Sequence, residues 1–97
     1  MDLSTAALFV RVIAENSETY SVGTQRSLLE GIFQLADLCQ ERLDERDDAF
    51  QYENLNTSLS LVRLFASDAL KHGNLAEGFR LAAECFAPAT AVPQEIL

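Results

Sequence analysis

The sequence predicts an all-α fold, a small four-helix bundle. Three separate segments of the 97-residue chain repeat their apolar residues with the 3.6-residue period of an amphipathic helix. A tight glycine turn joins two of these segments. With 48% hydrophobic residues, the chain is long enough for one domain with one core. We expect a domain over residues 1–87 and a C-terminal tail over 88–97, with helices at about residues 4–15, 27–46, 54–72 and 75–86.

The segment at residues 54–72 is the helix against which the others are expected to pack. Its apolar residues occupy one half of the helical wheel, with Leu64 as the one apolar residue on the polar half. An apolar half is wider than one neighbouring helix covers, so this helix should touch at least two others. Leu59 and Phe65 are expected at the centre of the core. The apolar half comprises Leu55, Leu59, Leu61, Val62, Phe65, Ala66, Ala69 and Leu70.

A turn at residues 72–74 separates this helix from the last one. Gly73 suits the left-handed conformation that often follows the end of a helix. Asn74 is a favourable N-cap, and Glu77 three residues later completes a capping box. His72 is the only histidine, and its place just before the turn favours a helix-capping role over a catalytic one.

The first helix is expected to begin after Asp2 or Ser4, because either residue is a suitable N-cap. Between Leu8 and Ile13 the segment is almost entirely apolar, so this helix should be covered on most sides. A β-strand is the alternative for this stretch, because valine and isoleucine favour strands. No partner strand is apparent elsewhere in the chain, and a helix is therefore favoured.

The second helix is expected to begin at Ser27, since Ser27 and Glu30 form the clearest capping box in the chain. An earlier start after Thr19 or Ser21 is the alternative. Gly31 lies inside this helix, where glycine costs about 1 kcal/mol relative to alanine. Either another helix crosses close to Gly31 or the helix merely tolerates the glycine, and the two explanations are equally favoured.

Acidic residues outnumber basic ones by fifteen to seven, so the formal net charge is −8. A nucleic acid or an anionic membrane is therefore not expected as a direct partner, because both need a basic surface. Residues 37–53 hold seven carboxylates and two arginines. This acidic window either keeps the protein in solution or faces a basic partner. The predicted partner face consists of Asp44, Glu45, Asp47 and Asp48.

The last helix is apolar over more than half of its circumference. Its charged residues Glu77, Arg80 and Glu84 form one narrow strip. A chain of this size is not expected to cover so much apolar surface by itself, and exposed apolar patches usually mark interfaces. We therefore expect a homodimer through this helix. The predicted interface residues are Leu75, Phe79, Leu81 and Phe86.

No motif in the sequence indicates an enzyme, a cofactor site or a metal site. The chain has no Gly-x-Ser-x-Gly turn and no phosphate-binding glycine loop, and the acidic window lacks the spacing of a calcium loop. Cys39 and Cys85 lie on predicted apolar faces, with no further ligand at metal-binding spacing. Reduced, buried thiols favour a cytoplasmic protein. The apolar run at residues 6–14 is too short to span a bilayer and lacks a preceding basic region.

Two stretches resemble known families. Residues 62–86, which contain ALKHGNLAEGFRLAAECF, resemble a single tetratricopeptide helix pair. Gly73 stands at the turn glycine of that repeat and Gly78 and Cys85 at two of its small positions, whereas Ala69 departs from an aromatic position. The resemblance implies a similar helix pair, since stable arrays need about three units. Residues 23–38 are similar to a family of short, uncharacterised bacterial helical proteins, which implies no activity.

These observations predict a small, acidic, non-enzymatic helical protein that mediates protein–protein interaction and associates with itself. An adaptor, a chaperone-like protein or a regulator would fit this description. The alternative is an acidic inhibitor that imitates nucleic acid and occupies the basic cleft of a partner protein. A dimeric mass favours the first function, and salt-sensitive binding to a basic protein favours the second.

Overall fold

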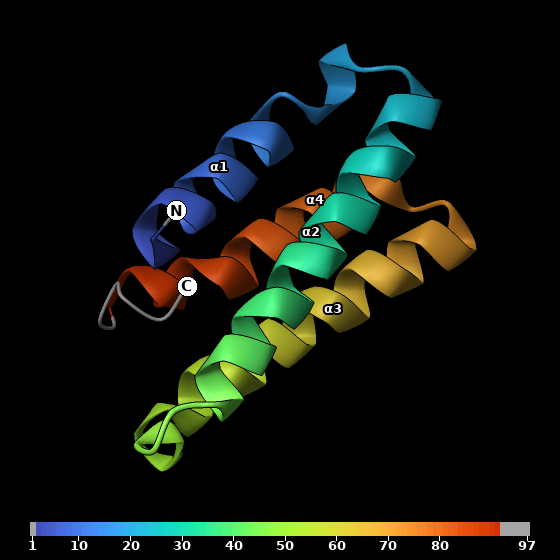
Figure 1. The fold of residues 1–97 in the computed structure, drawn as a ribbon. Coiled ribbons are helices and arrows are strands. Elements are labelled where there is room, and N and C mark those ends of the chain that lie inside the picture. The colour runs from blue at the N-terminus through green and yellow to red at the C-terminus, as the bar shows by residue number, and fades with distance from the viewer. Residues whose placement is uncertain (1, 92–97) are drawn as a thin grey trace.

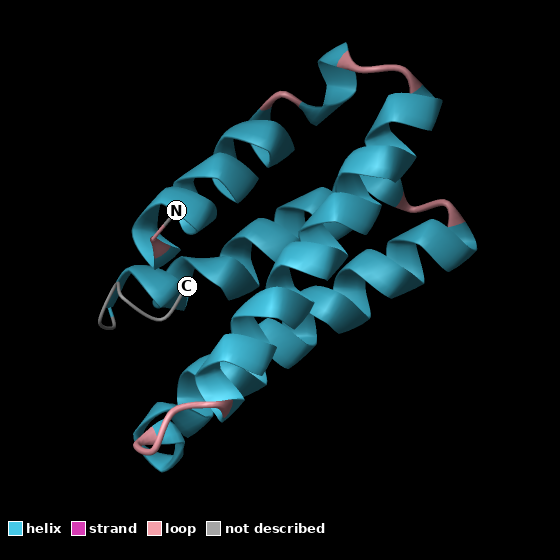
Figure 2. Ribbon diagram, viewed as in Figure 1, coloured by secondary structure: helices cyan, strands magenta, loops and turns pink. Residues whose placement is uncertain are grey.

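A computed structural model describes residues 2–91 of the chain (Figure 1). These residues form four α-helices, which are α1 (Leu3–Glu15), α2 (Val22–Asp44), α3 (Glu53–His72) and α4 (Leu75–Phe86). Three short 3₁₀ helices accompany them, η1 (Ser17–Thr19), η2 (Ala49–Tyr52) and η3 (Ala87–Ala91). The described part of the chain contains no strand, so the ambiguous stretch in the first helix is helical (Figure 2). The predicted all-α four-helix fold is confirmed.

The two longest helices, α2 and α3, form an antiparallel pair, and α4 packs against α3 (Figure 1). Helix α3 therefore touches two neighbours, as its wide apolar arc predicts. Helix α1 lies mainly on α4 and η3, and it makes few contacts with α2. The molecule is elongated, with principal extents of 41 × 22 × 17 Å.

One hydrophobic core receives side chains from all four helices and from η3. Helix α4 supplies the two largest fully buried side chains, Phe79 and Phe86. Leu3 of α1, Leu29 of α2 and Leu59 of α3 are also completely buried. The core is therefore built around α4, which the other helices enclose.

Leu59 is completely buried, as predicted for a residue at the centre of the core. The same prediction is wrong for Phe65, which is only half-buried. Leu61, on the same side of α3 as Phe65, is 37% exposed. The buried part of the arc is narrower than the whole apolar half, because α2 and α4 cover its middle, at Val62 and Ala66. Phe65 and Leu61 lie along one edge of the arc.

Local hydrogen bonds explain where α1 and α2 begin. The carboxylate of Asp2 accepts a hydrogen bond of 2.7 Å from the backbone N–H of Thr5, as predicted for an N-cap. The hydroxyl of Ser21 accepts one of 3.2 Å from the N–H of Thr24. Helix α2 therefore starts directly after Ser21, which confirms the alternative start. The favoured start at Ser27 is wrong because an earlier residue already caps the helix.

The turn between α3 and α4 matches the sequence in part. Gly73 has a φ of +79°, in the left-handed region, and its N–H donates a 2.8 Å hydrogen bond to the carbonyl of Ala69. The predicted capping box is wrong, because Asn74 caps α4 without a side-chain hydrogen bond. Glu77 instead pairs with Arg80, at 3.3 Å between Oε1 and Nη2.

The chain remains packed beyond the end of α4. Residues of η3 contact α1, and Ala89 is completely buried. Pro88 lies just after α4, where proline cannot continue a helix. The packed part of the chain therefore extends beyond the expected boundary at residue 87. The remainder of the predicted tail, residues 92–97, lies outside the described residues.

Helices α3 and α4 come close together at Gly78, and this contact generates a stability prediction. A Cβ atom on Gly78 would collide with the Cβ of Ala69. Gly78→Ala should therefore lower the free energy of unfolding by about 1–3 kcal/mol, the usual cost of overpacking, although alanine is the better helix former.

Gly23→Ala is the matched control for this prediction. Gly23 is helical and exposed, and a Cβ there would have no atom within 4 Å. Urea denaturation of both variants measures the difference. Equal stability of Gly78→Ala and Gly23→Ala would contradict the close contact.

Candidate functional site

Helix α1 is apolar on two opposite sides, and the described chain covers only one of them. The inner side, which includes Leu3 and Val10, packs into the core. The outer face of α1 consists of Leu8, Phe9 and Val12, which are 50%, 55% and 46% exposed. Coverage on most sides, which the sequence predicts, is not met within residues 2–91, because α4 and η3 reach only the inner side.

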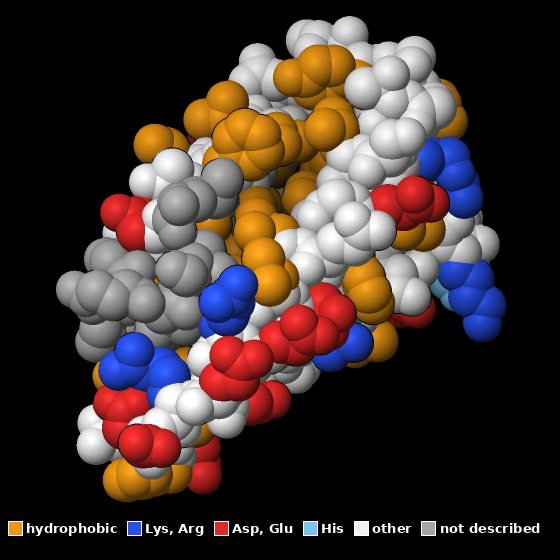
Figure 3. Space-filling view, in the orientation of Figure 1, with side chains coloured by type: hydrophobic (Ala, Val, Ile, Leu, Met, Phe, Trp, Pro, Cys, Tyr) orange, Lys and Arg blue, Asp and Glu red, His pale blue; other side chains and the backbone are white. Residues whose placement is uncertain are grey.

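An apolar groove separates α1 from α2 next to this outer face. Figure 3 shows hydrophobic side chains gathered over α1 and along the hollow between the two helices. The groove has a volume of about 270 Å³, and none of its lining residues is charged. Phe9 belongs to both the outer face and the groove, so the two form one continuous area, called here the α1–α2 surface. Besides the buried Val10, Ile13 and Ile32, the groove is lined by Phe9, Ser27, Leu28, Gly31 and Leu35.

Gly31 lies in the α2 wall of this groove. It is exposed, and a Cβ at this position would have no atom within 4 Å. No helix of the described chain crosses close to it. A close crossing at Gly31, one of the two explanations for a glycine inside this helix, therefore requires a helix from outside residues 2–91.

The interface that the sequence predicts on α4 is not exposed. Leu75, Phe79 and Phe86 are buried, and the two phenylalanines are completely enclosed. Only Leu81 is partly exposed, beside a hollow between α3 and α4. The expectation of a surface formed by Leu75, Phe79 and Phe86 is wrong for this chain, because α1, α2 and α3 all pack against α4.

The acidic window lies at the end of the α2–α3 pair, and three of the four predicted partner-face residues are exposed there. Asp44, Glu45 and Asp47 face solvent, whereas Asp48 is half-buried. Asp48 accepts two hydrogen bonds from Arg46, of 2.8 and 3.1 Å. These bonds hold the pKa of the Asp48 carboxyl below its usual value. Asp48 is therefore engaged within the chain, and Asp44, Glu45 and Asp47 are the available part of the face.

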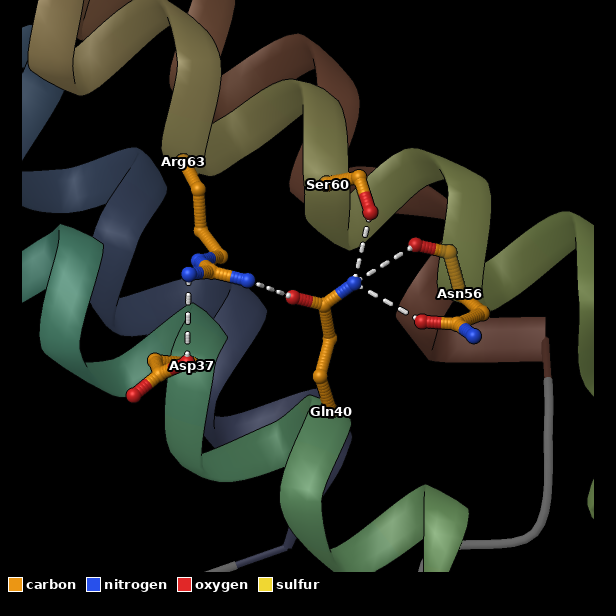
Figure 4. A network of polar contacts seen from close by, with 5 residues as sticks. All are labelled: Asp37, Gln40, Asn56, Ser60 and Arg63. Carbon is orange, nitrogen blue, oxygen red and sulfur yellow. Dashed lines mark hydrogen bonds and ion pairs between the residues drawn. The ribbon is translucent and has the colours of Figure 1, made fainter.

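A polar network between α2 and α3 was not expected from the sequence (Figure 4). The Nε2 of Gln40, a buried side chain, lies 2.7 Å from both the Asn56 Oδ1 and the Ser60 Oγ, and 3.1 Å from the Asn56 carbonyl. Arg63 donates a 2.8 Å hydrogen bond to the Oε1 of Gln40 and pairs with Asp37 at 3.4 Å. The only sequence signal was a glutamine on the buried side of α2. The network joins two helices, and within it the buried Nε of Arg63 has no hydrogen-bond partner among the described residues.

Nothing in the described chain gathers catalytic or metal-binding groups. Among residues 2–91, no group of three or more histidines, cysteines or carboxylates is placed to hold a metal ion. His72 is exposed at the end of α3. Cys39 and Cys85 are both free, and burial raises the pKa of the Cys39 thiol to about 11. Burial also raises the pKa of the Cys85 thiol, so neither cysteine is activated as a nucleophile.

No helix among the described residues has the length and apolar character needed to cross a membrane.

No family model matches the chain, and comparison with curated proteins and with solved structures also found no match. The resemblances of residues 62–86 and 23–38 therefore stay predictions.

The two thiols should differ in reactivity. A thiol reagent at mildly alkaline pH should label Cys85, which is half-buried, faster than Cys39, which is completely buried. Mass spectrometry of the labelled peptides measures both labelling rates. Equal labelling of the two cysteines in the folded protein would contradict the burial of Cys39.

Folding raises the pKa of the Cys39 thiol from 9.0 to about 11. The contribution of this thiol to stability is therefore fully present below pH 9 and is lost as the pH rises through about 11.

Proposed function

We propose that this chain is a small non-enzymatic protein that mediates protein–protein interaction through the α1–α2 surface. The observation that carries the proposal is the outer face of α1, which continues into the groove without an intervening charged residue. Contiguous apolar patches of this kind mark interaction sites on folded proteins. An adaptor, a chaperone-like protein or a regulator would use such a surface. A cytoplasmic setting, which the two free thiols favour, is part of this proposal.

Binding of a partner to the α1–α2 surface is favourable because Leu8, Phe9 and Val12 each still expose about half of their surface. Complete burial of one such side chain is worth about 1.5–3 kcal/mol, so covering the exposed halves contributes roughly 1 kcal/mol each. The inner side of α1 is already occupied by α4 and η3. We therefore propose that self-association, which the sequence predicts through α4, takes place through the outer face of α1.

This function predicts a position-specific contact with another protein chain. A photoreactive phenylalanine analogue at position Phe9 should cross-link to a second chain in cells, whereas the same analogue at position Leu64 should not. The two residues are similarly exposed, at 55% and 52%, and Leu64 lies on α3, which does not pack beside α1. Denaturing gels and mass spectrometry detect the adducts. Equal yields at both positions, or no adduct at either, would contradict the proposal.

The exposed carboxylates favour a second candidate function, the acidic inhibitor of a basic partner. Arg63 pairs with Asp37 and Arg46 with Asp48. Within residues 2–91, Asp44, Glu45 and Asp47 form no ion pair, and all three are exposed. Unpaired carboxylates at one end of an elongated molecule attract a basic protein and accelerate its association.

The test replaces the three available carboxylates, as Asp44→Asn, Glu45→Gln and Asp47→Asn together. The association rate with a basic nucleic-acid-binding protein at low salt should fall about tenfold, because electrostatic steering is lost, while the melting temperature stays nearly constant. Asp48 is left unchanged because it pairs with Arg46. Stopped-flow fluorescence measures the rate.

The control variant for this test removes three exposed carboxylates elsewhere on the chain, with Glu18→Gln, Glu30→Gln and Asp68→Asn. Its net charge equals that of the first variant. An equal loss of association rate in both variants would show that only net charge matters, and the acidic face would then have no specific role.

A further inference from the structure

A small hollow runs along the contact of α3 and α4, where the two helices meet at Gly78. Its lining residues recur every three or four positions, at 65, 68, 69 and 72 on α3 and at 77, 78 and 81 on α4. Residues at this spacing share one face of a helix, so the hollow follows the seam between two helix faces. Its volume is about 200 Å³. Pockets for drug-sized ligands have about 300–1,000 Å³, so this hollow has room for one side chain.

The walls of this hollow combine apolar groups with carboxylates. Phe65 and Leu81, one from each helix, are both half-buried there. Asp68 lines the hollow from α3 and Glu77 from α4, and both are exposed, as is His72 at the end of α3. No lysine or arginine of residues 2–91 lines it. Apolar walls below two carboxylates suit a side chain with an apolar stem and a positively charged head.

The chain itself shows how such walls hold an arginine. The guanidinium carbon of Arg63 lies 5.1 Å from the centroid of the Phe33 ring. The Nη2 of the same arginine lies 3.4 Å from the Oδ1 of Asp37 (Figure 4). Phe33 and Asp37 are four residues apart on α2 and therefore neighbours on one face of that helix. One aromatic ring and one carboxylate on the same helix face thus receive an arginine from another helix.

The same combination of ring and carboxylate occurs at Arg46. Its guanidinium carbon lies 5.7 Å from the centroid of the Tyr52 ring. Its Nε lies 2.8 Å from the Oδ1 of Asp48. The chain therefore uses an aromatic ring and a carboxylate together at two separate places, each time for an arginine.

Phe65 and Asp68 repeat this arrangement on α3. They are three residues apart, so they are neighbours on one face of the helix, and both line the hollow. Within residues 2–91, no arginine or lysine lies over the Phe65 ring, and none pairs with Asp68. The ring and the carboxylate are therefore available to an arginine from outside the described chain.

Arginine fits this place better than lysine does. A planar guanidinium lies flat on an aromatic ring while the N–H groups at its edge donate to a carboxylate. A lysine ammonium is a compact and strongly hydrated charge, which gains less from the ring. An arginine within a polypeptide brings only a positive charge, whereas free arginine also carries a carboxylate, which Asp68 and Glu77 repel.

We propose that the hollow between α3 and α4 binds an arginine side chain of a partner protein. The guanidinium lies against Phe65 and pairs with Asp68, and the apolar stem of the arginine packs on Leu81. Glu77, which pairs with Arg80 at 3.3 Å, adds negative charge from the opposite wall. The hollow shares no lining residue with the α1–α2 surface, so this inference does not depend on the function proposed for that surface.

The first test compares blocked hexa-arginine and hexa-lysine peptides, which carry the same charge. Each is titrated into the full chain labelled with ¹⁵N, and the dissociation constant is taken from the amide shifts of residues 65–81. Hexa-arginine should bind there about threefold more tightly than hexa-lysine, because the guanidinium gains a cation–π contact with Phe65. Equal constants for the two peptides, or no shifts at residues 65–81, would overturn the proposal.

The second test removes the carboxylate and the ring separately. Asp68→Asn and Phe65→Leu should each raise the dissociation constant of hexa-arginine about threefold. Glu30→Gln and Phe9→Leu are the matched controls, because both residues are exposed and neither lines the hollow. Loss of such a short-range contact acts mainly on the dissociation rate, whereas the acidic face acts on the association rate.

The controls should change the dissociation constant much less than the two variants in the hollow. Circular dichroism should show the helix content of the parent in all four proteins. A constant that rises no more for Asp68→Asn than for Glu30→Gln would overturn the pairing of the guanidinium with Asp68. An equal rise for Phe65→Leu and Phe9→Leu would overturn the contact with the ring.

Discussion

The arrangement of this chain depends on the close approach of α3 and α4 at Gly78. Because Gly78 has no side chain, α4 can lie directly against Ala69 of α3. At this depth Phe79 and Phe86 point into the core and are completely buried. Burial of each phenylalanine contributes about 1.5–3 kcal/mol, a large share of the stability of so small a domain.

A consequence of this depth is that the two phenylalanines of α4 are not available to a partner. Helices α1, α2 and α3 pack against the apolar side of α4, and η3 continues along α1 after α4 has ended. The described chain then has no further element with which to cover α1 from outside. Within residues 2–91, α1 therefore lies at the edge of the bundle and packs on one side only, and its outer face stays exposed.

The polar network of Gln40 acts together with the buried apolar residues of α2 to hold one side of this helix toward α3. Gln40 contacts Asn56, Ser60 and Arg63, all on α3, and a buried amide that lost these partners would be costly. Gly31 lies nine residues before Gln40, which is two and a half turns of an α-helix. The two residues therefore lie on opposite sides of α2. By holding Gln40 toward α3, the network keeps Gly31 and the groove wall turned toward α1.

Local features of this fold could be predicted from the sequence by itself. The four helices, the Asp2 cap and the left-handed conformation of Gly73 each depend on residues that are close together in the sequence, and the structure confirms them. Two local features were wrong, the start of α2 and the capping box at Asn74, because several residues nearby satisfy the same local rule. The apolar excess of α1 was also visible, as a helix too apolar for one neighbour to cover.

Only the tertiary structure decided which of the apolar helices is covered. The first and last helices are both apolar over more than half of their circumference. The sequence therefore does not show which of them is covered, and the interface was predicted on the last one. A helical wheel shows how wide an apolar arc is, but it contains no information on how many neighbours lie around the helix. Helix α4 lies among three others and α1 lies at the edge, so Phe79 is enclosed while Phe9 remains exposed. The position of a helix in the bundle, which contacts distant in sequence determine, therefore decided where this protein presents an apolar surface.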